Sequence, residues 1–245
     1  MKRGELCIKK GSGDICGAEC GESYGADNRE GIFADNGNLR LRQKTLLLHS
    51  CCGPCSTSVV ERLARDYDIT IFFYNPNITD EGEYRRRLEA QRSFIEIFNS
   101  SPTAPARVAL VVGTYEPNVF IRACEGHEGD PEGGVRCEIC FSLRLAKAAE
   151  HASLHGFDCF STTLSVSPHK DHAAIARIGG RLGMQCGVEF IAEDFKKHNG
   201  YARSVELSKA YGLYRQSYCG CEFARGGGRP ESGDRSKSGC GRLIK

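Results

Sequence analysis

The sequence predicts an α/β fold, a Rossmann-like parallel sheet with helices on both faces and a metal site at the carboxyl ends of its strands. Short apolar runs alternate with longer helical patterns through the middle of the chain. The first of these, residues 45–49, is a short apolar run of the kind typical of a buried parallel strand. This run leads directly into a cysteine-rich turn. Sites in such sheets form where the strands end, so this turn is the expected position of the site.

The expected elements follow one another as strand and helix, which favours a parallel sheet. Pro54 suits the first turn of a helix, Pro76 ends the second strand, and Gly156 is a plausible helix stop. The expected strands are residues 45–49, 69–74, 107–112, 157–162 and 188–192. The expected helices are residues 56–66, 81–98, 116–125, 139–155, 171–182 and 202–211.

The 245 residues suit one large domain or two small ones. Residues 1–43 are rich in Gly and charged residues without a sustained period, and we expect a flexible leader there. Residues 44–224 would form a single α/β catalytic domain, and residues 225–245 a flexible basic tail.

The composition favours a reduced, cytoplasmic protein. The chain has 14 cysteines, but it shows neither a signal peptide nor an apolar run long enough to cross a membrane. Cysteine pairs in such a protein indicate metal or redox chemistry more often than structural disulfides. The formal net charge of +2 does not indicate bulk nucleic-acid binding, and it leaves room for a local basic face.

Seven cysteines in three tight groups are the most informative feature. They are Cys51, Cys52, Cys55, Cys137, Cys140, Cys219 and Cys221. One tetrahedral zinc or one cubane iron–sulfur cluster uses four thiolates. The surplus favours a redox cluster with further chemistry, or a second metal.

The local geometry of each group differs. Cys51 and Cys52 are adjacent, so we expect their side chains to point in different directions. Cys55 follows one helical turn later, at a helix N-terminus that favours thiolate. Cys137 and Cys140 form a local metal clip where a loop enters a helix.

Two other interpretations of these thiols stay open. Four of them could form a structural zinc site, since ligand type alone does not separate zinc from iron. The first group could instead carry out disulfide exchange. Buried lone cysteines are usually inert, so we assign no role to Cys124, Cys159 and Cys186. The roles of Cys7, Cys16 and Cys20 in the leader stay undecided.

Six blocks in order resemble the QueH family of cobalamin-independent epoxyqueuosine reductases. They are LLLHSCCGPCSTSV, FFYNPNI, EYRRRLEA, RCEICFSLRLAKAA, FSTTLSVSPHKD and YGLYRQSYCGCEFA, and the resemblance covers roughly residues 45 to 224. The resemblance implies the last step of queuosine biosynthesis in tRNA processing. There an oxidoreductase reduces the epoxide of epoxyqueuosine to an alkene with two electrons and two protons.

The resemblance also implies a 4Fe-4S cluster beside a mononuclear iron, with no part for disulfides. Seven thiolates fit four cluster ligands and up to three iron ligands. The expected cluster ligands are Cys51, Cys137, Cys140 and Cys219. Each close pair would then be split between the two metal units, and Cys55 would bind the iron.

The iron would act as a Lewis acid on the epoxide oxygen, and a nearby acid would protonate it. His49 is the first candidate for this acid, and Asp171, His169 and Tyr218 are weaker ones, of which Asp171 is kept with His49 as a catalytic residue. His49 could instead be a hydrogen-bonded histidine at a strand end. Asn75 and Asn77 would bind the ring hydroxyls of the substrate or cap a turn.

The expected partners are tRNA, whose wobble base in the anticodon loop would enter the pocket, and a small electron-carrier protein. No membrane is expected. Lys and Arg side chains would contact phosphates, or else form solvated helix faces. These candidates are Arg85, Arg86, Lys196 and Lys197.

The alternative function is a zinc-stabilised, Rossmann-like tRNA-binding or nucleotide-dependent tRNA-modifying protein without redox activity. The nucleotide-dependent form needs a phosphate-binding glycine loop after the first strand. The turn at residues 51–58 matches neither GxGxxG nor GxxxxGK[ST].

Overall fold

The computed structural model describes residues 34–35, 38–39 and 42–224. Most of the expected leader and the whole expected tail lie outside these residues, as do Cys7, Cys16 and Cys20. Two short strands, β1 (Ala34–Asp35) and β2 (Asn38–Leu39), pair antiparallel ahead of the main domain.

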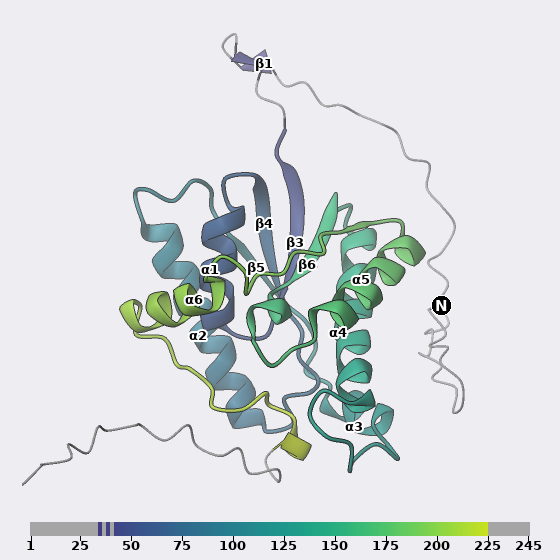
Figure 1. Ribbon diagram of the computed structural model, residues 1–245. Coiled ribbons are helices and arrows are strands. Elements are labelled where there is room, and N and C mark those ends of the chain that lie inside the picture. The colour runs from purple at the N-terminus through teal and green to yellow at the C-terminus, as the bar shows by residue number, and fades with distance from the viewer. Residues whose placement is uncertain (1–33, 36–37, 40–41, 225–245) are drawn as a thin grey trace, which may run out of the picture.

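Five parallel strands form one sheet in the order β5-β4-β3-β6-β7 (Figure 1). They are β3 (Lys44–Ser50), β4 (Tyr67–Phe73), β5 (Ala109–Val112), β6 (Cys159–Thr162) and β7 (Glu189–Phe190). The prediction of a parallel α/β sheet is confirmed. The last strand is shorter than the predicted 188–192, because at the sheet edge it pairs with β6 through two residues only.

Helices cover both faces of this sheet. They are α1 (Gly53–Leu63), α2 (Glu81–Ser100), α3 (Pro117–Ala123), α4 (Val135–Leu154), α5 (His172–Cys186) and α6 (Gly200–Ala210). Two 3₁₀ turns, η1 (Thr163–Val166) and η2 (Glu222–Ala224), follow β6 and the last cysteine pair. Helix α4 starts before the predicted residue 139, because the carbonyl of Gly134 already accepts from the Cys137 N–H at 2.9 Å.

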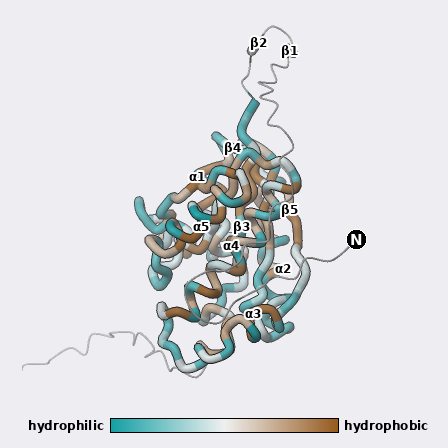
Figure 2. Tube along the Cα trace, turned by 90° about the vertical axis from the view of Figure 1, so that its right-hand side faces the viewer, coloured by the Kyte–Doolittle hydropathy of each residue, from teal (hydrophilic) through white to brown (hydrophobic). Residues whose placement is uncertain are grey.

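The alternation of side chains along β3 builds two apolar cores. Leu47 faces the core under α4 and α5, whereas Leu46 and Leu48 face the core under α1 and α2. Helix α6 packs on α1, outside that second core. Figure 2 shows the hydrophobic stretches gathered along the central strands. No helix among the described residues is long and apolar enough to span a membrane.

Three central strands end side by side, and this positions the site. Ser50 at the end of β3 pairs with Phe73 of β4, and His49 pairs with Thr162 of β6. The segments that follow these strands begin at Cys51, Tyr74 and Thr163. Chemistry-bearing residues from distant parts of the chain therefore meet at one sheet edge.

Candidate metal centre

The first three cysteines converge on one point at the turn between β3 and α1. The sulfur atoms of Cys51, Cys52 and Cys55 all lie within 4.8 Å of one another, and those of Cys51 and Cys52 are 3.7 Å apart. The expectation that these neighbours point apart is wrong. The chain bends at Cys51, between the strand and the N-cap residue Cys52 of α1, and both thiols lie on the same side. We call these three residues the triad.

Gly53 makes this tight turn possible. A Cβ at this position would collide with the carbonyl oxygen of Ala90 in α2. No side chain fits there, so α1 begins in direct contact with the backbone of α2. Pro54 then occupies the first turn of α1, as predicted.

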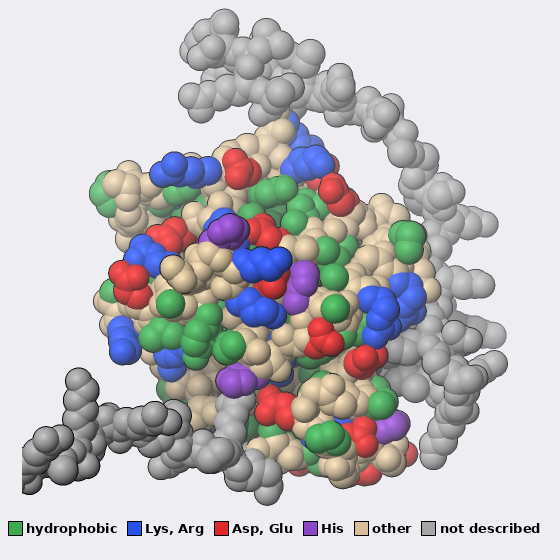
Figure 3. All heavy atoms as spheres, viewed as in Figure 1, with side chains coloured by type: hydrophobic (Ala, Val, Ile, Leu, Met, Phe, Trp, Pro, Cys, Tyr) green, Lys and Arg blue, Asp and Glu red, His purple; other side chains and the backbone are tan. Residues whose placement is uncertain are grey.

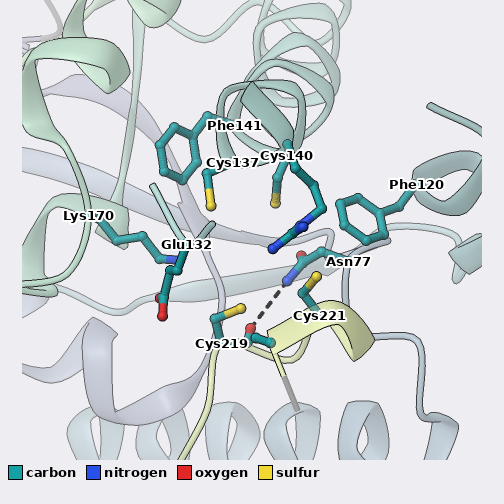
Figure 4. A pocket seen from close by; sticks show the side chains of 11 residues that line it. Asn77, Phe120, Glu132, Cys137, Cys140, Phe141, Lys170, Cys219 and Cys221 are labelled. Atoms are coloured by element: carbon teal, nitrogen blue, oxygen red, sulfur yellow. Dashed lines mark hydrogen bonds between the residues drawn. The ribbon is translucent and has the colours of Figure 1, made fainter. Parts of the chain in front are cut away.

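The other four cysteines line one pocket (Figure 4). Cys137 and Cys140 lie in the first turns of α4, and Cys219 and Cys221 precede η2. Their thiols point toward a common space from opposite sides (Figure 4). Between the last two, Gly220 has φ +98°, and a Cβ there would lie 2.9 Å from Ile78. We call these four residues the quartet. All ten cysteines in the described residues are free thiols.

Two buried arginines hold the thiol-bearing segments together. Arg87 of α2 donates to the carbonyl oxygens of Tyr218 and Cys219, at 3.0 and 3.1 Å, and pairs with Glu83 at 2.7 Å. Arg87 therefore fixes the last cysteine segment against α2. It belongs to the basic run 85–87, and its burial shows that a solvated helix face does not describe that residue.

Arg144 lies between the triad and the quartet. Its guanidinium donates to the Asn75 side-chain oxygen at 2.7 Å and to the Cys140 sulfur at 3.8 Å. Its charge also lowers the pKa of the Cys51 thiol. The side chain is 2% exposed, and among the described residues it has no carboxylate partner. A buried cation of this kind calls for an anionic neighbour.

The triad and the quartet each contain one thiol with a lowered pKa. Hydrogen bonds from Cys52 and Cys55 hold the pKa of Cys51 well below its usual value, and raise their own. A hydrogen bond from Cys221 lowers the pKa of Cys219 to about 5. Burial raises the pKa of Cys140. A bound metal would replace the protons of the remaining thiols, since thiolate is the ligand form.

The two candidate acids have structural contacts. His49 is fully buried, its ring lies 2.8 Å from the Thr162 hydroxyl and 3.1 Å from the Tyr74 carbonyl oxygen, and burial lowers its pKa to about 3. The geometry favours the hydrogen-bonded strand-end histidine. Asp171 is the N-cap of α5 and accepts from the N–H of Ala173 at 2.8 Å. A capping role accounts for it.

The two predicted asparagines differ in whether their side-chain oxygens already have a hydrogen-bond partner. Asn75 has a partner for both its amide nitrogen and its oxygen, because it donates to the Ser50 carbonyl at 2.9 Å and accepts from Arg144. Asn77 lines the quartet pocket and donates to the Cys219 carbonyl at 3.2 Å (Figure 4). Its buried side-chain oxygen has no partner among the described residues. Asn77 is therefore suited to receive a donor from a bound molecule.

The predicted basic residues lie on two surfaces. Arg85 pairs with Glu81, and Arg86 pairs with Glu83, on the solvent side of α2. Lys196 and Lys197 precede α6, and the Lys196 ammonium donates to the Lys170 carbonyl at 3.3 Å. Lys196 thus connects this segment to the quartet pocket.

Sequence reasoning missed three residues of the site. Arg144 follows Cys140 by four residues and Arg87 follows Glu83 by four, so helical spacing alone could have placed them on the inner faces. The third is Lys170, whose ammonium lies 5.7 Å from the centre of the Phe141 ring in the quartet pocket. The thiols nearby raise the pKa of Lys170 despite its burial.

Comparison with known proteins gives consistent results. The family model described as epoxyqueuosine reductase QueH matches residues 46–226. The epoxyqueuosine reductase QueH of Streptococcus pyogenes is 42% identical over 180 residues, which cover 74% of this chain and 70% of that protein. The Staphylococcus aureus protein of the same name is 41% identical, over 73% of this chain and 75% of that protein. The Thermotoga maritima one is 36% identical, over 74% and 90%.

Proposed function

This chain belongs to the epoxyqueuosine reductase QueH family, and we propose that it carries out the family reaction at the seven-thiol centre. It is an oxidoreductase of queuosine biosynthesis that reduces epoxyqueuosine to queuosine. The carbon–oxygen bonds of the epoxide break, an alkene forms, and the oxygen leaves as water after two electrons and two protons are added. Because this is a tRNA modification, the enzyme acts on tRNA.

We propose that the quartet holds a 4Fe-4S cluster and that the triad holds the separate iron. The donor sets support this division, because four thiols share one pocket and a cubane takes four thiolates. Three converging thiols leave a fourth tetrahedral position open for substrate. This division assigns Cys51 to the iron and Cys221 to the cluster, whereas the sequence alone suggested the reverse. When bound, the cluster would supply electrons and the iron would polarise the epoxide oxygen.

The polar residues of the pocket would orient the substrate. The free side-chain oxygen of Asn77 would accept a hydrogen bond from a ring hydroxyl of the substrate. Lys170 keeps its proton at neutral pH, since the neighbouring thiols raise its pKa. It would therefore stabilise negative charge in the pocket rather than give up a proton. His49 stays neutral at neutral pH and would hold Thr162 and Tyr74 in place.

We propose that the electrons come from a small carrier protein. The turn after β3 is occupied by the triad instead of a phosphate-binding glycine loop, which argues against a bound nicotinamide or flavin dinucleotide at that position.

Metal and sulfide analysis of cysteine variants, purified without oxygen, tests the assignment. Cys52→Ser should lose about one iron and keep its acid-labile sulfide. Cys140→Ser should lose most of the sulfide, because a cubane needs four ligands. Cys186→Ser, outside both groups, is the matched control. Loss of sulfide from Cys52→Ser would overturn the division, and zinc without sulfide in the unaltered protein would favour the zinc-stabilised alternative.

Activity is measured separately, as conversion of epoxyqueuosine to queuosine in an anticodon stem-loop RNA followed by mass spectrometry. Cys52→Ser and Cys140→Ser should both lose turnover, and Cys186→Ser should keep it. Turnover retained by both site variants would remove the centre from the reaction.

A further inference from the structure

A second cavity, apart from the metal centre, lies between α1 and the start of α6. Its volume is about 150 Å³. Ser58, Glu61 and Arg62 line it from α1, and Phe195, His198, Gly200 and Arg203 line it from the other side. Figure 3 shows Lys, Arg and His side chains, with Asp and Glu side chains among them, on the face that α6 and α5 present. The cavity is large enough for a small polar group.

Ser58 is the observation that points to a ligand. Its residue is 8% exposed, and its buried hydroxyl has no hydrogen-bond partner among the described residues. The neighbouring hydroxyl of Thr57 donates to the Pro54 carbonyl at 2.9 Å, so the helix itself does not prevent such bonding. An unpartnered buried hydroxyl costs about 1–3 kcal/mol, which a bound acceptor would offset.

The start of α6 supplies further donors. The N–H groups of Gly200 and Arg203 have backbone acceptors, the carbonyls of Lys197 and Asn199 at 3.2 and 2.8 Å. Those of Tyr201 and Ala202 have none among the described residues, and no side chain caps the helix. Open N–H groups and the positive end of the helix dipole both favour an anion.

The two arginines that line the cavity are each paired with a carboxylate. Arg62 pairs with Glu193 at 2.6 Å, and Arg203 pairs with Glu206 at 2.8 Å as well as with Glu61. The Glu61 carboxylate is occupied by Arg203 through two hydrogen bonds of 2.6 and 2.9 Å. These pairs fix the walls of the cavity, and the donors left for an anion are the Ser58 hydroxyl and the open N–H groups of α6.

The position of the cavity relates it to the substrate. Ser58 follows Cys55 by three residues on the same side of α1, a rise of about 5 Å. Lys196, in the segment that leads into α6, connects to the quartet pocket through its bond with the Lys170 carbonyl. The cavity therefore begins about one helical turn from the triad. A nucleotide that places its base at the metal centre would bring a neighbouring phosphate close to it.

We propose that the cavity between α1 and α6 binds one backbone phosphate of the RNA beside the modified nucleotide, with Ser58 and the first turn of α6 as donors. The proposal rests on the proposed function for the identity of the RNA. Its chemistry, a phosphate oxygen received by a hydroxyl and helix N–H groups, would also fit free inorganic phosphate. The experiment separates these two sources.

Binding is measured by fluorescence anisotropy for an anticodon stem-loop RNA and for a series with one neutral methylphosphonate at each loop phosphate in turn. Ser58→Ala should bind the unmodified RNA about tenfold more weakly, as expected for losing a hydrogen bond to a charged group. The control is Ser100→Ala, an exposed helix serine whose hydroxyl bonds the Glu96 carbonyl. At one loop position, the neutral linkage should weaken binding to the unaltered protein about tenfold and to Ser58→Ala less than twofold.

Equal affinity of Ser58→Ala and Ser100→Ala for every RNA would overturn the proposal. Calorimetry with inorganic phosphate gives the second test. If Ser58→Ala loses phosphate binding but keeps its RNA affinity, the cavity binds free phosphate and the proposal is overturned. If the unaltered protein shows the position-specific loss but no conversion of epoxyqueuosine, the proposed function fails and the phosphate site stands.

Discussion

Arg144 is the residue whose replacement tests the electrostatics of the centre most directly. It is buried between the triad and the quartet, 3.8 Å from the Cys140 sulfur and 2.7 Å from the Asn75 oxygen. Arg144→Met removes the charge and keeps much of the volume. We expect the loaded centre to become harder to reduce, because an added electron loses a neighbouring positive charge.

The magnitude follows from the geometry. Two unit charges about 4 Å apart interact by about 4 kcal/mol at the effective dielectric typical of proteins. If an added electron spreads evenly over the four iron atoms of a cluster, about a quarter of its charge lies near Cys140. The interaction energy with Arg144 is then about a quarter of this value. Reduction should therefore become less favourable by about 1 kcal/mol of free energy, which lowers the midpoint potential by about 40 mV for one electron. Unfolding should also become easier by about 1–3 kcal/mol, since the Asn75 oxygen loses its donor.

The assay is an anaerobic spectroelectrochemical titration of the loaded protein. Arg144→Lys keeps the charge and should recover most of the potential, although it loses the fork that bonds two partners. Arg177→Met is the control, because Arg177 is an exposed cation paired with Glu138 beside Cys137. A potential in Arg144→Met equal to that of the unaltered protein, or a fall in Arg144→Lys as large as in Arg144→Met, would refute the reasoning.

Three further predictions concern single residues. In metal-free protein, alkylation of Cys219 followed by mass spectrometry should have its midpoint near pH 5, because a lowered pKa keeps the reactive thiolate as pH falls; a midpoint near pH 9 would contradict this. Asp171→Ala should lower the free energy of unfolding by about 1 kcal/mol through loss of the α5 cap, while metal content and turnover stay the same; lost turnover with full metal content would restore Asp171 as an acid. Gly53→Ala should lower the melting temperature and the iron content together, because its Cβ would meet the Ala90 carbonyl; unchanged values would show that the turn can relax.

The architecture was predictable because it depends on patterns that survive in a single sequence. The continuous apolar run at β3 and its neighbours predicted buried parallel strands, and all five are present. The boundaries were less predictable where they depend on one hydrogen bond, as at Gly134 before α4, or on a short edge pairing, as at β7. Such bonds follow from the packing of the whole domain.

The thiols of the site were predictable, but their grouping was not. Residue type and close spacing identify ligands, whereas the direction of each side chain depends on a turn angle. The bend at Cys51 brings its sulfur beside that of Cys52, whereas neighbours in a regular strand point to opposite sides. The supporting arginines were missed for a related reason, because Arg87 reads as one more residue of a basic surface run until its burial is known.

The positive charges around the thiols bear on which chemistry the centre can hold. Arg144 lies close to the quartet and has no carboxylate partner among the described residues. Leaving a buried charge uncompensated costs several kcal/mol. Disulfide exchange would leave the quartet neutral in its oxidised form, and the Arg144 guanidinium would then face a neutral Cys140 sulfur. A metal–thiolate centre carries negative charge in every oxidation state it uses, so the positive surroundings favour a permanently bound metal over a cycling disulfide.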